Sequence, residues 1–70
     1  MMSKYGIFIY WSETDKKFLA EAPELPGCMS DGQTYLEAAR NIETVIDEWV
    51  ETAQMLGREV PTPKGKLLYA

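Results

Sequence analysis

An apolar stripe that recurs every three or four residues between positions 35 and 56 constrains the fold more than any other feature of the sequence. Seven residues repeat at alternating steps of four and three, and three more widen the stripe: Tyr35, Ala39, Ile42, Ile46, Trp49, Ala53 and Leu56, with Leu36, Val45 and Val50 beside them. This spacing places the apolar residues on one face of an α-helix. The sequence therefore predicts one long amphipathic helix, long enough to cover a sheet and still project a seam.

The ends of this helix are also predictable. Thr34, followed three residues later by Glu37, is typical of a capping box, in which the hydroxyl accepts a backbone N–H bond and the carboxylate reaches back to the cap. Gly57 is expected just after the C-cap, where a left-handed conformation is common. The segment 60–63, Val-Pro-Thr-Pro, cannot continue a helix and is expected to be extended.

Strand-like segments lie on both sides of the helix. Residues 5–11 are rich in aromatic and β-branched side chains, and residues 17–22 alternate so that Phe18, Ala20 and Ala22 point inward. The polar residues 12–16 are expected to form a hairpin loop, and the prolines and glycine of 23–27 end the second strand. Short strands are expected at 28–30 and 66–69, with Asp31-Gly32 as a turn.

The first strand is apolar on both faces. Tyr5, Ile7, Ile9 and Trp11 share one face, whereas Phe8 and Tyr10 share the other. Such a strand either is central in a covered sheet or has one face against a partner. Trp49, on the helix stripe, is expected in the core.

These elements predict an α+β fold in the order β-β-β-α-β, one antiparallel-based sheet under a single long helix, forming one domain over residues 1–70. A domain of this size has a small core and usually needs further stabilisation. One cysteine and no histidine exclude an intramolecular disulfide and the usual zinc sites. We therefore expect a homodimer or a higher even homo-oligomer.

The charge balance indicates the kind of partner. The formal net charge is −4, and the seven lysines and arginines are scattered along the chain, so direct nucleic-acid binding is not expected. A basic protein is a better match, although mild acidity also serves solubility. The sequence has no signal-peptide pattern and no apolar run of membrane-spanning length, and we expect a cytoplasmic protein.

Catalytic chemistry finds little support in the sequence. Glu21 and Asp31 lie near strand ends and three other acids lie in loops (Glu13, Asp15 and Glu24), a pattern that does not aim a carboxylate cluster at Mg²⁺. Cys28 has no histidine to activate it and is expected to be a small buried packing residue. No glycine-rich phosphate loop is present. We expect neither an enzyme nor a metal or other cofactor site.

A group of aromatic residues offers one more possibility. The group consists of Tyr5, Phe8, Tyr10, Trp11 and Phe18. Aromatic side chains of this kind can stack on the bases of single-stranded nucleic acid. Because no arginine or lysine lies between them, these residues are better explained as part of the core and of a subunit interface.

The central part of the sequence resembles a known family. The segment 20–28 reads Ala-Glu-Ala-Pro-Glu-Leu-Pro-Gly-Cys and is followed by Ser30, Gly32, Thr34 and Glu37-Ala38. This pattern is similar to the signature of HicB-type antitoxins. We expect the signature residues to be mainly structural: Pro23, Leu25, Pro26, Gly27, Cys28, Gly32, Thr34, Glu37 and Ala38, with Ser30 between them. The aromatic first strand, the helix that ends at Gly57 and the Pro61-x-Pro63 connector extend the resemblance over nearly the whole chain.

The resemblance implies a fold like a truncated ribonuclease H, self-association, and a HicA-type toxin as the partner. That toxin is a small basic ribonuclease with a double-stranded-RNA-binding fold, and the antitoxin would cover its active site. Many HicB antitoxins continue into a C-terminal DNA-binding domain. Here the sequence ends at Ala70, just after the last predicted strand, so no such domain is expected.

The acids near the signature loop, Glu21, Glu24 and Asp31, are our candidates for the toxin contact, because carboxylates form charge-assisted bonds with basic groups. Solubility alone is the competing explanation for these acids. The alternative function is a stand-alone homo-oligomeric domain without a toxin, which binds a small ligand or another regulator. A metal-dependent nuclease is a third, weaker hypothesis.

Overall fold

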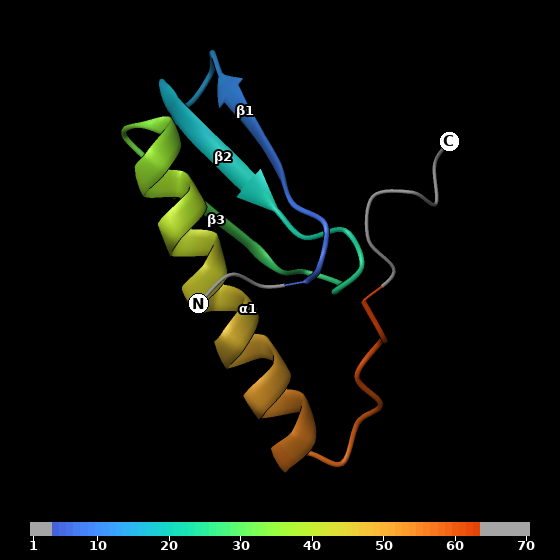
Figure 1. The fold of residues 1–70 in the computed structure, drawn as a ribbon. Helices are drawn as coiled ribbons and strands as arrows, with labels where there is room; N and C mark the ends of the chain where they lie inside the picture. The colour runs from blue at the N-terminus through green and yellow to red at the C-terminus, as the bar shows by residue number, and fades with distance from the viewer. Residues whose placement is uncertain (1–3, 64–70) are drawn as a thin grey trace, which may run out of the picture.

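A computed structural model describes residues 4–63 and shows a three-stranded sheet with one helix packed along one of its faces (Figure 1). The elements follow the chain in the order β1 (Phe8–Ser12), β2 (Lys17–Glu21), β3 (Met29–Gly32) and α1 (Tyr35–Met55). The predicted fold class, α+β with one antiparallel sheet under a single long helix, is confirmed. The strand predicted at 66–69 lies outside the described residues.

The sheet is antiparallel throughout, in the order β1-β2-β3. Ile9 pairs with Ala20, and because Ala20 is fully buried, this row of side chains faces the helix. Leu19 pairs with Tyr10 on one side and with Asp31 on the other. Since neighbouring residues on a strand point to opposite faces, this second row lies on the face away from α1.

The core lies between the sheet and the helix, as the alternation of β2 and the helical stripe predict. Its buried residues come from β2, the loop after it and the middle of α1: Ala20, Ala22, Leu25, Cys28, Ala38, Ile42 and Ile46. Half-buried apolar side chains pack around them: Tyr5, Ile7, Ile9, Phe18, Val45, Trp49 and Val50. Many of the central side chains are small, which lets the helix lie close to the sheet.

The loop between β2 and β3 is built from two consecutive β-turns. The Leu25 N–H donates to the Ala22 carbonyl and the Cys28 N–H to the Leu25 carbonyl, both at 3.0 Å. Pro26 supplies the φ angle that the second turn needs, and Gly27 adopts a φ of 78°, as a type II turn requires. The loop therefore returns the chain into β3 and inserts Leu25, which is 1% exposed, into the core.

Both ends of α1 carry the predicted caps. The Thr34 hydroxyl accepts a 3.0 Å bond from the Glu37 N–H. The Glu37 carboxylate accepts from the N–H of Gln33, one residue before the cap, where we expected the bond to reach the cap itself. At the other end, Gly57 has a φ of 73°, and the bond from the Arg58 N–H to the Ala53 carbonyl completes a Schellman motif.

The strand boundaries differ from the prediction by more than one residue at two places, and by one residue at the end of β1, the end of β2 and the start of β3. Asp31-Gly32, predicted as a turn, belongs to β3, because Gly32 pairs with Phe18 and Asp31 with Leu19. The first strand begins at residue 8 rather than 5, since the Gly6 N–H donates to the Glu24 carboxylate instead of to a neighbouring strand.

The buried part of the apolar helical stripe is also shorter than predicted. Tyr35 and Leu56 are 60% and 62% exposed. The last turns of α1 extend beyond the strand ends, which leaves Leu56 uncovered (Figure 1). Ala38, outside the predicted stripe, is fully buried against Gly32. Trp49 is half-buried at the edge of the core, and its indole N–H donates to the Pro26 carbonyl at 2.9 Å.

Candidate partner-binding surface

The face of the sheet that points away from α1 carries large apolar side chains with no described element over them. Phe8, Tyr10 and Met29 are 53%, 43% and 51% exposed. The pairing Phe8–Glu21–Met29 and the pairing Tyr10–Leu19–Asp31 form adjacent rows on this face. We call the set the outer sheet face; it consists of Phe8, Tyr10, Lys17, Leu19, Glu21, Met29 and Asp31.

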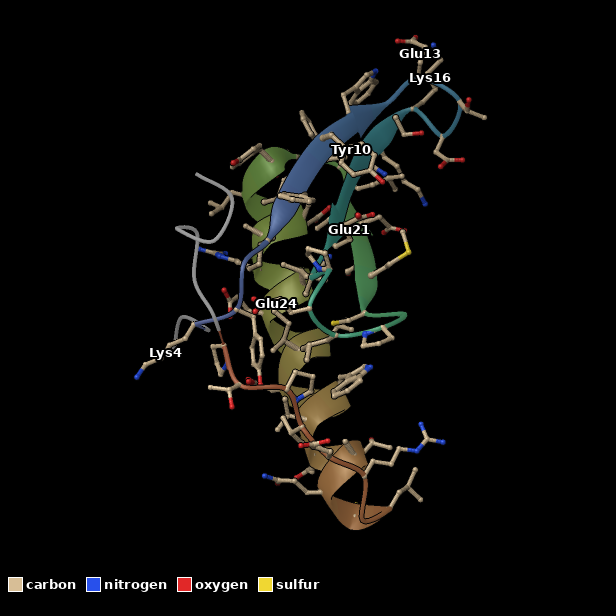
Figure 2. The ribbon with its side chains drawn as sticks, turned by 90° about the vertical axis from the view of Figure 1, so that its right-hand side faces the viewer. Lys4, Tyr10, Glu13, Lys16, Glu21 and Glu24 are labelled. Carbon is tan, nitrogen blue, oxygen red and sulfur yellow. The ribbon has the colours of Figure 1, made fainter. Side chains whose placement is uncertain are left out.

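Polar contacts on the outer sheet face hold its charged side chains in place. The Tyr10 hydroxyl donates to Glu21 Oε2 at 3.3 Å, and the two side chains lie together in front of the strands in Figure 2. Lys17 Nζ and Asp31 Oδ2 form an ion pair of 3.0 Å. Desolvation and the Glu21 carboxylate raise the pKa of Tyr10, and the bond to Asp31 raises the pKa of Lys17. The tyrosine is thus a neutral donor and the lysine a cation at physiological pH.

The three candidate carboxylates do not form one cluster. Glu21 and Asp31 lie on the outer sheet face, in adjacent rows of β2 and β3. Glu24 lies in the β2–β3 loop, beyond the strand ends and away from Glu21 (Figure 2). Its Oε1 accepts a 3.1 Å bond from the Gly6 N–H, so Glu24 fixes the segment that leads into β1. Its role in binding a partner stays a prediction that this contact does not test.

A shallow depression adjoins the outer sheet face at the end of β2, where the loop between β2 and β3 begins. It has a volume of about 140 Å³, and Glu21 and Met29 are part of its wall together with the loop residues 22, 23 and 25–28. A depression of this size accommodates one side chain of a partner rather than a small-molecule ligand, for which pockets are typically about 300–1,000 Å³. A basic side chain placed in it would meet the Glu21 carboxylate at its edge.

Four of the signature residues lie in the core or in the loop between β2 and β3. Leu25 and Cys28 are buried in the core, and Pro26 and Gly27 form the type II turn between them. Burial raises the pKa of the Cys28 thiol, which makes it a poor nucleophile. Within residues 4–63, no group of three or more acids, cysteines or histidines is arranged to hold a metal ion.

The aromatic residues singled out in the sequence do not form one platform. Phe8 and Tyr10 lie on the outer sheet face, whereas Phe18 packs on the helix side, 5.2 Å from the Trp11 ring and 6.1 Å from that of Tyr35. Met29 was missed as a surface residue. The signal that identifies it is the register of β2 and β3, because Met29 pairs with Glu21 on the outer sheet face.

The family and the relatives of this chain were identified by comparison with known proteins. A family described as the HicB-like antitoxin of bacterial toxin–antitoxin systems matches residues 5–67. A UPF0150 protein of Synechocystis is 36% identical over 63 residues, which cover 90% of this chain and 85% of that protein. A UPF0150 protein of Thermoplasma acidophilum is 33% identical over 58 residues, or 83% of each chain.

A second UPF0150 protein of Synechocystis is 36% identical over 56 residues, which cover 80% of this chain and 68% of that protein. No solved structure matches the chain. Among residues 4–63, no helix combines the length and the apolar character that crossing a membrane requires.

Proposed function

Because the chain belongs to the HicB-like antitoxin family of bacterial toxin–antitoxin systems, we propose that it binds a small basic HicA-type ribonuclease and covers the active site of that toxin. The protein acts by binding rather than by catalysis. Its outer sheet face is the surface that contacts the toxin, with Glu21 and Asp31 as the charged contacts and the exposed aromatic and methionine side chains as the apolar ones.

The observation that carries this proposal is the composition of the outer sheet face. Phe8, Tyr10 and Met29 together present an exposed apolar surface in a domain whose core is small. Exposed apolar side chains framed by polar ones are typical of protein–protein interfaces, in which tyrosine, phenylalanine and methionine are enriched. Because α1 packs on the opposite face, a toxin that docks here would not displace the core.

Charge complementarity supports a basic protein as the partner. The chain has a formal net charge of −4, and a basic ribonuclease has a positive active-site surface because it binds the phosphate backbone of RNA. Glu21 and Asp31 already have neighbours on this face, Tyr10 and Lys17, but each carboxylate has capacity for further donors. An arginine or lysine of the toxin that reaches Glu21 would also lie near the Tyr10 hydroxyl, whose oxygen can accept a further hydrogen bond.

The test is co-expression of this chain with the small protein encoded beside it, with growth and co-purification measured together. We expect the neighbouring protein alone to arrest growth, the pair to restore growth, and the two proteins to purify as a stable complex. Inhibition of RNA cleavage in the purified complex would establish that binding covers the active site.

Three results would contradict the proposal in whole or in part. A neighbouring protein that is harmless, or one that is toxic but does not bind this chain, removes the antitoxin function for that pair. The stand-alone homo-oligomeric domain would then be the better account of the protein. A complex that forms but leaves RNA cleavage intact would overturn the mechanism while keeping the binding.

A further inference from the structure

Three aromatic rings form a row on the helix side of the sheet, at the end of the molecule where β1 ends and α1 begins (Figure 1). The ring centroids of Trp11 and Phe18 are 5.2 Å apart and those of Phe18 and Tyr35 are 6.1 Å apart, edge to face in both pairs. Trp11 is 45% exposed, and Tyr35 is more exposed still. We call Trp11, Phe18 and Tyr35 the aromatic row. The core does not need the exposed parts of its outer two rings.

The rings of the aromatic row are held in place from below and from one side. Phe18 packs against the core and supports the ring on either side of it. The Trp11 indole N–H donates to Glu13 Oε1 at 3.1 Å, and Glu13 is paired with Lys16. Rings that are already ordered lose little conformational freedom when a ligand docks on them. The aromatic row is therefore a preorganised surface.

The dimensions of the aromatic row fit a polyproline II helix. This helix rises about 3.1 Å per residue with three residues per turn, so prolines at i and i+3 lie on one side about 9 Å apart. The two ring-to-ring steps of the row, 5.2 and 6.1 Å, can span that distance. Surfaces lined by aromatic side chains bind proline-rich segments in this conformation.

A free donor on the aromatic row fits the same ligand. Within residues 4–63, the Tyr35 hydroxyl forms no hydrogen bond. A polyproline II helix has no internal hydrogen bonds, so its carbonyl groups are available to accept from such a donor. Tyr35 can thus contribute both an apolar ring and a hydrogen bond to the ligand.

The hairpin loop next to Trp11 favours a ligand with a basic residue. The loop contains two acids, Glu13 and Asp15, and one lysine, Lys16. The bonds from Lys16 and Trp11 lower the pKa of Glu13, so this side chain is a carboxylate at physiological pH. Both carboxylates can accept further hydrogen bonds. An arginine or lysine at one end of the ligand therefore has complementary charge beside it.

We propose that the aromatic row binds a proline-rich segment of another protein in the polyproline II conformation, with a basic residue at one end. Two prolines of the segment pack on Trp11 and Tyr35, and the residues between them lie over Phe18. The Tyr35 hydroxyl donates to a carbonyl of the segment. The basic residue lies at the Trp11 end, near the acids of the hairpin loop.

The proline segment of this chain itself lies elsewhere. The Tyr5 hydroxyl, which precedes β1, donates to the Pro61 carbonyl at 2.6 Å, whereas Trp11 lies near the other end of that strand. The aromatic row is also on the opposite face of the sheet from the outer sheet face. The proline-rich ligand and the toxin can therefore bind together, and this proposal does not rest on the antitoxin function.

The test is an NMR titration of the isotope-labelled chain with a short synthetic peptide that has Pro-x-x-Pro spacing and a flanking arginine. The chain contains two tryptophans, so the indole signals supply a control within the molecule. The Trp11 signal should shift, and the signal of Trp49, which bonds to the Pro26 carbonyl, should not. A peptide with alanine in place of both prolines should bind at least tenfold more weakly, and glutamate in place of the arginine should also weaken binding.

Variants of the chain locate the contact. Tyr35→Ala should weaken peptide binding at least tenfold, whereas Tyr35→Phe keeps the ring and should weaken it less. Met55→Ala is the control, because this side chain is 80% exposed at the other end of α1 and should not affect binding. The circular-dichroism spectrum of each variant checks that it folds.

Several results would overturn the proposal. The first is a Trp11 signal that does not move at millimolar peptide, and the second is equal binding of the alanine peptide. A Trp11 signal that responds to single-stranded DNA but not to the peptide would show a surface that stacks on bases. A Trp11 signal that moves when the chain alone is diluted would show that a second copy covers the row.

Discussion

Gly32 and Ala38 determine how closely the helix approaches the sheet. A Cβ atom added at Gly32 would lie 2.4 Å from the Ala38 backbone nitrogen and 2.8 Å from the Glu37 carbonyl carbon. Backbone atoms cannot move aside as the end of a flexible side chain can. Its φ is not in the left-handed range, so the backbone conformation does not require a glycine here. Glycine is needed because a larger residue would not fit between the sheet and the helix.

Replacing Gly32 with alanine should lower the free energy of unfolding by about 1–3 kcal/mol, the usual cost of overpacking a core. Gly6→Ala is the matched control, since a Cβ there meets only the Glu24 carboxylate oxygen at an ordinary 3.8 Å. Urea denaturation followed by circular dichroism measures both changes. Equal losses in the two variants would show that the close approach at Gly32 is not what limits the fold.

Cys28 allows a test of burial through its thiol. Removal from water disfavours the thiolate and raises the pKa of Cys28, so the folded chain holds the thiol proton more firmly than the unfolded chain does. That contribution to stability is complete below the ordinary thiol pKa and is lost as the pH rises through the raised value. Stability should therefore fall in the alkaline range, and Cys28→Ala should remove this part of the fall.

Alkylation rates provide the direct measurement for Cys28. At one fixed pH, the thiol of the folded chain should react with iodoacetamide at least about tenfold more slowly than the thiol of the chain in urea, because reaction requires an accessible thiolate. Equal rates would contradict the buried position of Cys28.

At the scale of the elements, the N-terminal cap of α1 provides a sensitive position. Thr34 accepts the Glu37 N–H bond, so Thr34→Ala should cost about 0.5–2 kcal/mol of stability, and Thr34→Ser should retain most of it. Thr44→Ala is the control within the helix, where an exposed threonine only bonds back to the Arg40 carbonyl and alanine is the better helix former. If the Thr34 and Thr44 variants lose the same stability in thermal denaturation, the cap has no special role.

The order and type of the elements could be predicted because each leaves a local pattern. The helix, its cap and the signature turn depend on spacing, on a hydroxyl and on Pro-Gly, all of which lie within a few residues. The role of Asp31-Gly32 as part of β3 could not be predicted from such patterns, because it depends on pairing with Leu19 and Phe18. The exposure of Leu56 follows from the length of the sheet, which the spacing of apolar residues along the helix does not record.

The candidate partner-binding surface could also be predicted only in part. Glu21 and Asp31 could be chosen as acids near strand ends, but only the register of β2 and β3 places them on one face with Met29. Glu24 appears equivalent in the sequence, yet it bonds to the backbone of Gly6, a residue far from it along the chain. Contacts of this kind depend on tertiary structure and leave no periodic signal.

At the scale of the whole molecule, the two faces of the sheet have different roles. The outer sheet face is apolar with acidic residues and fits a basic partner, whereas the opposite face of the sheet packs on α1 and forms the core. Each chain therefore presents one outer sheet face for a toxin. The stoichiometry of the purified complex should then be one toxin per chain.

The central claim is that the outer sheet face binds the toxin, and calorimetric titration of the toxin with charge-reversed variants tests it most directly. Glu21→Lys with Asp31→Lys alters this face, and Asp47→Lys with Glu51→Lys makes the same change in net charge on exposed positions of α1. We predict that the first pair weakens binding at least about tenfold, or 1.4 kcal/mol, more than the second. Equal weakening by both pairs, or no weakening by the first, would contradict the claim.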